Sequence, residues 1–155
     1  MEKIIQNISL DIKRCEDVIV ENNYLEIVIA IEEISDKYKE EVFKENENNN
    51  VWRYSKKDLQ VIKDKLIEYK KITISKLKTQ LIDKKISELK NYIDENNEKT
   101  VGDIIEIIKE INYLEITKEE KWIKLTKILD EVKNQNLEVG YRMLQLINII
   151  ISEEN

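Results

Sequence analysis

The sequence predicts an all-α protein of about six helices, and three observations carry this prediction. The 155 residues contain no proline and only two glycines, so residues that break helices are scarce. Apolar residues recur at spacings of three and four, and no alternating strand pattern exceeds four residues. An apolar content of 41% suffices for a core, and 37% charged residues are typical of amphipathic helices. We expect one helical domain over 1–155, with possible layers at 1–50, 55–96 and 100–152.

The first two helices are predicted to form an antiparallel hairpin. Residues 3–20 have one apolar face, made of Ile4, Ile5, Ile8, Ile12, Cys15 and Ile19. Asn23 and Glu26 have capping-box spacing, which starts a second helix at about 24–45. Its predicted buried residues are Tyr24, Ile27, Val28, Ile31, Ile34, Tyr38 and Val42. Because the connection is so short, the two helices are expected to pack side by side.

A long basic third helix follows a polar loop at 45–50. Ser55 and Asp58 are predicted to cap it, and Tyr54 and Leu59 have the spacing of a hydrophobic staple. An unbroken helix over 56–94 would be roughly 58 Å long. The β-branched segment 72–75 interrupts the apolar pattern, so both a continuous helix and a kinked one are compatible with the sequence.

Three further helices are predicted as a C-terminal layer. Thr100 with Asp103, and Thr117 with Glu120, have capping spacing. The helix after Thr117 carries Trp122, which we expect in the core, with Leu125, Ile128, Leu129 and Val132. The last helix, 137–152, has an apolar stripe of Leu137, Tyr141, Leu144, Ile147 and Ile151, and further apolar residues off that stripe. A helix that is apolar nearly all round is central in its bundle or is covered by a partner.

The composition argues against catalysis. The chain has no histidine, and its two glycines stand alone, which excludes catalytic triads with histidine and glycine-rich phosphate loops. Cys15 is the only cysteine and lies on an apolar stripe, so we expect a buried thiol. We therefore expect no enzyme, no cofactor and no metal site. The N-terminus lacks signal-peptide features, and no apolar run is long enough to span a bilayer, so we expect a cytoplasmic protein of a bacterial host.

Charge is distributed unevenly along the chain. The net charge is −6 over residues 21–50, +5 over 51–97 and −4 over 98–155. One interpretation is complementarity between neighbouring helices, together with ordinary solvated faces. The other is a partner-binding surface on the acidic second helix, which could compete for a basic groove that normally holds nucleic acid. Its candidate residues are Glu32, Glu33, Asp36, Glu40 and Glu41.

Two other segments are candidate binding sites. Trp52, Arg53 and Tyr54 belong to the three residue types most enriched in binding hot spots, although Trp52 and Tyr54 could instead seal the entry to the third helix. The lysines of 56–85 offer an alternative, phosphate-binding face for nucleic acid. Its candidate residues are Lys56, Lys57, Lys63, Lys70, Lys71 and Lys78.

Part of the chain resembles a known kind of protein. Two segments resemble small, mostly uncharacterised helical proteins of AT-rich bacteria and their prophages. One is the stretch from Tyr54 to Leu66, and the other runs from Lys121-Trp122 to Leu137-Glu138-Val139-Gly140 and the apolar helix that contains it. The abundance of isoleucine, lysine, glutamate and asparagine is typical of such genomes. The resemblance implies a helical fold and a mobile-element or defence context, and it transfers no functional residues.

These observations favour a non-enzymatic protein-binding factor in phage–bacterium conflict. Its concrete form would be an inhibitor of an immune effector, such as a CRISPR nuclease, that acts by steric or charge-mimic blocking. The alternatives are the nucleic-acid-binding module with the lysines of 56–85, and an oligomerising or membrane-active protein with the apolar helix 137–151. Both a monomer and a homodimer are compatible with the sequence.

Overall fold

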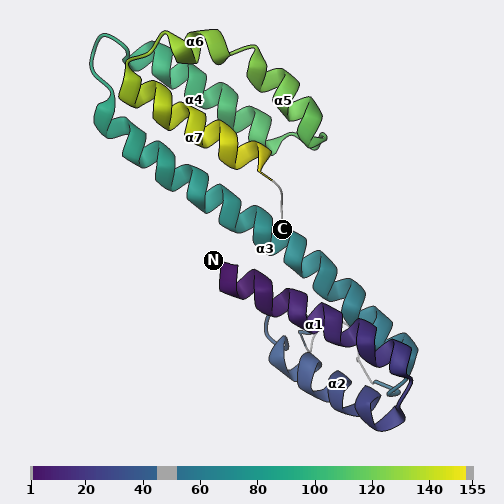
Figure 1. The fold of residues 1–155 in the computed structure, drawn as a ribbon. Helices are drawn as coiled ribbons and strands as arrows, with labels where there is room; N and C mark the ends of the chain where they lie inside the picture. The colour runs from purple at the N-terminus through teal and green to yellow at the C-terminus, as the bar shows by residue number, and fades with distance from the viewer. Residues whose placement is uncertain (1, 45–51, 153–155) are drawn as a thin grey trace. The chain divides into compact units, whose positions relative to one another are not determined.

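The protein is helical throughout the part of the chain that the structure describes. A computed structural model describes residues 2–44 and 52–152, which hold seven α-helices, one short 3-10 helix and no β-strand (Figure 1). The prediction of an all-α fold is therefore confirmed. The predicted polar loop at 45–50 and Val51 lie outside the described residues. The chain divides into two compact units, Met1–Lys76 and Leu77–Asn155, and the long helix α3 contributes to both.

The first unit begins with two helices that pack against each other, α1 (Glu2–Glu21) and α2 (Tyr24–Lys37). Asn22 joins them in the left-handed backbone region, with φ of 57°, which asparagine tolerates better than most residues. The Asn23 side chain then accepts a hydrogen bond from the Glu26 N–H at 3.2 Å. The predicted start of the second helix is thus confirmed, because its capping residue satisfies one of the free N–H groups of the first turn.

The second helix ends at Lys37, well before the predicted end near residue 45. Tyr38 leaves the helical conformation, and the chain turns through residues 39–42, with the Val42 N–H bonded to the Tyr38 carbonyl at 2.8 Å. The Tyr38 ring is buried against Tyr69, and its hydroxyl donates to Asp11 Oδ2 at 2.6 Å. This anchored side chain explains the early end, because Tyr38 is held by α1 and α3 contacts. Tyr24, which was predicted to be buried, is exposed.

The third helix, α3, spans Lys56–Leu89. Ser55 Oγ accepts the Asp58 N–H at 3.3 Å, and Asp58 Oδ2 accepts the Ser55 N–H at 3.2 Å, so the predicted cap is confirmed. The helix is continuous through residues 72–75, where Thr73 Oγ1 donates to the Tyr69 carbonyl at 2.8 Å. A threonine side chain can bond the carbonyl four residues earlier within a continuous helix, so the β-branched segment does not interrupt α3. The helix ends at Leu89, short of the predicted residue 94, and a 3-10 turn, η1 (Lys90–Tyr92), follows.

The two ends of α3 are buried in separate cores. In the first unit, Leu59, Ile62 and Leu66 pack with the inner faces of α1 and α2. In the second unit, the buried α3 residues join a core formed by the helices that follow. The residues of α3 between these two sets, 67–81, include none that is fully buried. The long helix therefore supplies one wall to each core.

The second unit contains four helices after η1: α4 (Glu98–Tyr113), α5 (Lys118–Thr126), α6 (Leu129–Lys133) and α7 (Leu137–Ile151). Helix α4 packs against α5 and α7, and α7 also packs against α5 and α6. Thr117 and Glu120 form the predicted capping box at the start of α5, with both reciprocal bonds present. The predicted cap at Thr100 is wrong, because α4 already begins at Glu98.

The predicted fifth helix is two helices in the structure, α5 and α6, separated at residues 127–128. Leu125 and Ile128 are both buried across this break. Trp122 was expected in the core, but 42% of it is exposed. The short helix around Leu125 uses only one buried position, so the tryptophan one turn earlier lies at the edge of the core.

The last helix buries only part of the predicted stripe, because Ile147 is buried and Ile151 half-buried whereas its other three members are exposed. Its core residues are Val139, Met143, Leu146, Ile147 and Ile150. Leu137, Tyr141 and Leu144, from the predicted stripe, are exposed by 91%, 58% and 48%. At 100° per residue these three residues lie opposite the core face. Helix α7 therefore has two apolar faces, and only one of them is covered in the described structure.

Candidate protein-binding surface

Helix α2 separates cleanly into a core face and an outer face. Ile27, Ala30, Ile31 and Ile34 are buried at helical spacing. The positions i, i+4, i+7 and i+11 on the opposite side are Leu25, Ile29, Glu32 and Asp36, which are exposed or half-buried. We call this second set, together with Glu33, Glu40 and Glu41, the acidic surface. All five of its carboxylates belong to exposed residues.

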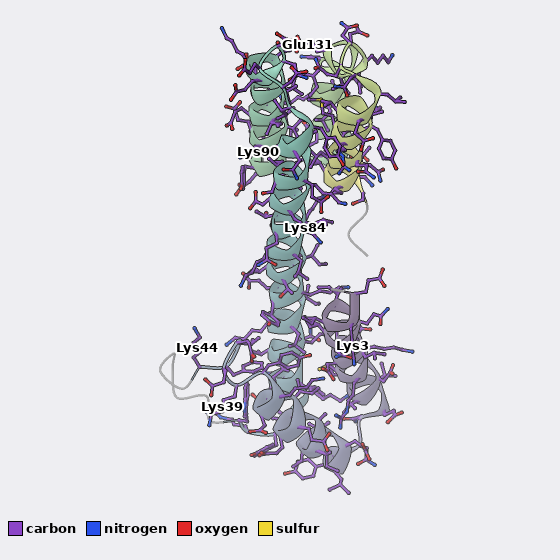
Figure 2. The ribbon with its side chains drawn as sticks, turned by 90° about the vertical axis from the view of Figure 1, so that its left-hand side faces the viewer. Lys3, Lys39, Lys44, Lys84, Lys90 and Glu131 are labelled. Atoms are coloured by element: carbon purple, nitrogen blue, oxygen red, sulfur yellow. The ribbon has the colours of Figure 1, made fainter. Side chains whose placement is uncertain are left out.

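Three carboxylates of the acidic surface lie at or just after the carboxyl end of the helix. Asp36 is in the last turn of α2, and Glu40 and Glu41 lie in the turn that follows, which also holds Lys39; Lys44 comes just after it (Figure 2). A helix carries a partial negative charge at its carboxyl end, which disfavours the Asp36 carboxylate in the last turn and favours Lys37 in the same turn. Helix stability therefore does not explain why acidic residues gather at this end.

Two members of the acidic surface have partners within the first unit. Arg14 of α1 forms an ion pair with Glu33 at 2.6 Å. The Tyr54 hydroxyl donates to Glu32, and this bond raises the pKa of Tyr54. None of the ion pairs within residues 2–44 and 52–152 includes Asp36, Glu40 or Glu41. Complementarity between neighbouring helices thus accounts for part of the acidic surface and leaves three carboxylates outside it.

The aromatic segment 52–54 contributes to the first core. Trp52 is half-buried and packs edge-on against Phe43, with ring centroids 5.8 Å apart. Tyr54 is also half-buried and packs against the same core. Arg53 is exposed, and its backbone N–H donates to Asp58 Oδ2 at 2.8 Å. These contacts are consistent with the interpretation that Trp52 and Tyr54 seal the entry to the third helix. Of the three candidate residues in this segment, Arg53 is the one with an exposed side chain.

The lysines proposed for nucleic acid differ in their surroundings. Lys63 pairs with Glu16 of α1 at 3.2 Å, and Lys78 donates to the Ile150 carbonyl at 2.7 Å. Lys56, Lys57 and Lys71 are exposed, and Lys70 is half-buried. Two of the six positively charged groups are therefore engaged within the protein, as are two of the five carboxylates of the acidic surface.

Cys15 is fully buried, and burial raises the pKa of its thiol to about 11. The thiol is therefore protonated near neutral pH and is a poor nucleophile. Among residues 2–44 and 52–152, no group of three or more acidic or cysteine side chains is arranged to hold a metal ion.

Sequence reasoning missed two polar clusters. Asp11 accepts hydrogen bonds from Lys37 Nζ and the Tyr38 hydroxyl, both at 2.6 Å. In the second unit, Arg142 stacks over the Tyr92 ring at 4.2 Å and forms a 2.9 Å bond with Glu138. Most of the partners lie 26 to 50 residues apart in sequence, so no local sequence pattern predicts these clusters.

Comparison with models of known protein families, with curated protein sequences and with solved structures found no match. Within the described ranges, no helix combines the length and the apolar character needed to cross a membrane. The candidate function therefore rests on the surfaces described above.

Proposed function

We propose that this chain is a non-enzymatic protein-binding factor whose acidic surface docks on a positively charged surface of its partner. The observation that supports this proposal is the position of Asp36, Glu40 and Glu41 at the carboxyl end of α2. The five exposed carboxylates of the acidic surface outnumber the two lysines within 32–41, Lys37 and Lys39, and Lys37 is engaged by Asp11, so the surface can attract a basic partner.

The chemistry of the surface suits a nucleic-acid-binding partner. Exposed carboxylates, with Leu25 and Ile29 beside them on the same face, can contact a groove lined by Lys and Arg and by some apolar area. A protein that occupied such a groove would exclude nucleic acid from it. An immune effector such as a CRISPR nuclease in phage–bacterium conflict is the concrete form of this proposal.

The test uses neutral variants of the acidic surface. The triple variant Asp36→Asn, Glu40→Gln, Glu41→Gln keeps the size of each side chain and removes three charges. The matched control, Glu110→Gln, Glu115→Gln, Glu119→Gln, removes three charges from exposed residues of the second unit. Proteins captured from a bacterial lysate on immobilised wild-type chain are compared with those captured on each variant, at low and at high salt.

The proposal predicts a captured protein that is lost with the acidic-surface variant, retained with the control and released by salt. A captured protein that both variants retain equally would refute the assignment of this surface. A captured nucleic acid that is lost on lysine substitution, with no protein present, would instead support the alternative module.

The exposed face of α7 favours a second candidate function, oligomerisation. Leu137, Tyr141 and Leu144 form an uncovered apolar stripe opposite the core. Such a stripe at helical spacing is typical of a surface that packs on another helix. Light scattering of the wild type and of Leu137→Gln with Leu144→Gln tests this function, since a dimer through this face should dissociate in the double variant.

A further inference from the structure

We propose that a pocket in the second unit binds a short segment of a partner protein through one apolar side chain flanked by basic residues. The pocket lies where the end of α3, the turn after it and the first turns of α4 meet, and its volume is about 540 Å³. Pockets of roughly 300–1,000 Å³ are typical of binding sites. The proposal rests on the proposed function only in taking a protein as the ligand.

The floor of the pocket is apolar. Ile86 of α3, Ile93 after η1 and Ile105 of α4 line it. Ile86 and Ile105 also belong to the core, so the floor is held in place by the packing of the unit. A rigid apolar floor suits an aliphatic or aromatic side chain, which gains affinity by leaving water.

Gly102 supplies the opening in the wall. It lies in the fifth position of α4, where glycine costs roughly 1 kcal/mol relative to alanine. Its φ is not positive, and a Cβ built on it would meet no atom within 4 Å. Neither backbone conformation nor close packing therefore requires a glycine here. The absent side chain leaves space beside the isoleucines that a ligand can enter.

The rim of the pocket determines the sign of the ligand's charge. Asp94, Glu95, Glu98 and Glu106 surround it, against Lys90, which Figure 2 labels, and Lys109. Lys109 already pairs with Glu106 at 3.7 Å. Asp94 is held in place by the backbone N–H groups of Asn96 and Asn97, at 2.9 and 3.1 Å. A net negative rim around an apolar floor fits a segment such as Lys-Leu-Leu-Lys and disfavours an acidic one.

The two glycines of the chain provide a direct test. Selective labelling with ¹⁵N-glycine gives two amide signals, from Gly102 in the pocket and from Gly140 in α7, which does not line it. The full chain is titrated to millimolar concentrations with the blocked peptide acetyl-Lys-Leu-Leu-Lys-amide, and separately with acetyl-Glu-Leu-Leu-Glu-amide. We expect a saturable shift of Gly102 alone, with the basic peptide only. No shift of Gly102, or equal shifts of both glycines, overturns the pocket, and an equal response to the acidic peptide overturns its charge preference.

Two sets of variants connect the signal to the site. Glu95→Gln with Glu98→Gln keeps both glycines and should weaken the basic peptide by roughly 2- to 30-fold, since each exposed ion pair contributes about 0.2–1 kcal/mol. Gly102→Leu should abolish saturation transfer from the protein to the peptide leucine methyls, whereas Thr100→Leu, exposed on the same helix outside the pocket, should not. Unchanged transfer in Gly102→Leu would refute the proposal. The acidic surface plays no part in these measurements, so their failure and the failure of the proposed function are distinguishable.

Discussion

The two glycines of the chain lie in helices, and the structure predicts opposite effects when each is replaced by alanine. Gly102 is the fifth residue of α4 and Gly140 the fourth residue of α7. Both helices should gain about 1 kcal/mol from the higher helix propensity of alanine, because alanine loses less backbone entropy on folding. The difference between the two sites comes from what the new methyl group meets.

At Gly102 the methyl group meets nothing within 4 Å, so the propensity gain should appear undiminished. At Gly140 it would lie 3.2 Å from the Val132 carbonyl oxygen of α6. That carbonyl also accepts the Gln135 N–H at 3.2 Å, so it is part of the turn between α6 and α7 and moves only with backbone. Overpacking typically costs 1–3 kcal/mol, which cancels or exceeds the gain. We expect Gly102→Ala to raise the free energy of unfolding by about 1 kcal/mol. Gly140→Ala should leave it unchanged or lower it by up to ~2 kcal/mol.

The assay uses the two tryptophans, because one lies in each unit. A Trp52→Phe background leaves Trp122 as the fluorescent reporter of the second unit. Urea unfolding of the full chain should then shift its midpoint upward by roughly 0.3–1 M in Gly102→Ala, with an unchanged slope. If Gly102→Ala is neutral or destabilising, the reasoning about the open wall of the pocket is refuted. If Gly140→Ala stabilises as much as Gly102→Ala, the contact between α6 and α7 is wrong.

Three further predictions concern burial and charge. Burial raises the Cys15 pKa from 9.0 to about 11, so the unfolded thiol ionises first, and by pH 10, before the tyrosines with raised pKa values (Tyr38 and Tyr54) dominate, the first unit should lose about 1 kcal/mol. Trp52 fluorescence in Trp122→Phe measures this loss, and Cys15→Ala should remove it; a loss that persists would assign it to other groups. Asp11→Ala should cost about 1–3 kcal/mol in urea unfolding, because the buried Tyr38 hydroxyl loses its acceptor, whereas exposed Asp17→Ala should stay within about 0.5 kcal/mol. Leu146→Ala should lower the free energy of unfolding by about 2–5 kcal/mol and Leu144→Ala by much less. Equal losses would contradict the assignment of Leu146 to the buried face of α7 and of Leu144 to the exposed face.

Local sequence patterns predicted the helices and several of their starts. Asn23, Ser55 and Thr117 each cap a helix, as their spacing to the acidic residue three positions later indicates. A capping box involves only atoms within one turn, so four residues contain all the information that it needs. The predicted cap at Thr100 failed because α4 begins at Glu98, after Asn97, whose side chain accepts the Asp94 N–H and makes no capping hydrogen bond to the helix.

The faces of the helices were harder to predict than the helices. In α7 apolar residues occupy both sides, so periodicity alone allowed the stripe containing Leu144 and the stripe containing Leu146. Only the packing of α4, α5 and α6 against one side decides between them. The same holds for Trp122, whose exposure depends on where the chain breaks between α5 and α6. The acidic residues of α2 could be found in the sequence because charge is a property of composition. The pairing of Glu33 with Arg14 and of Glu32 with Tyr54 could not, because these partners lie on other segments of the chain.

The sequence by itself therefore determines an all-helical chain, its principal caps and the charge of each segment, because these properties depend on residues within a turn or two of one another. The tertiary structure decides which face of each helix is buried, how Asp11 and Arg142 find partners far along the chain, and that Gly102 opens a pocket while Gly140 fits under a carbonyl. These properties depend on which helices lie next to one another, and spacing along a single helix contains no information about its neighbours.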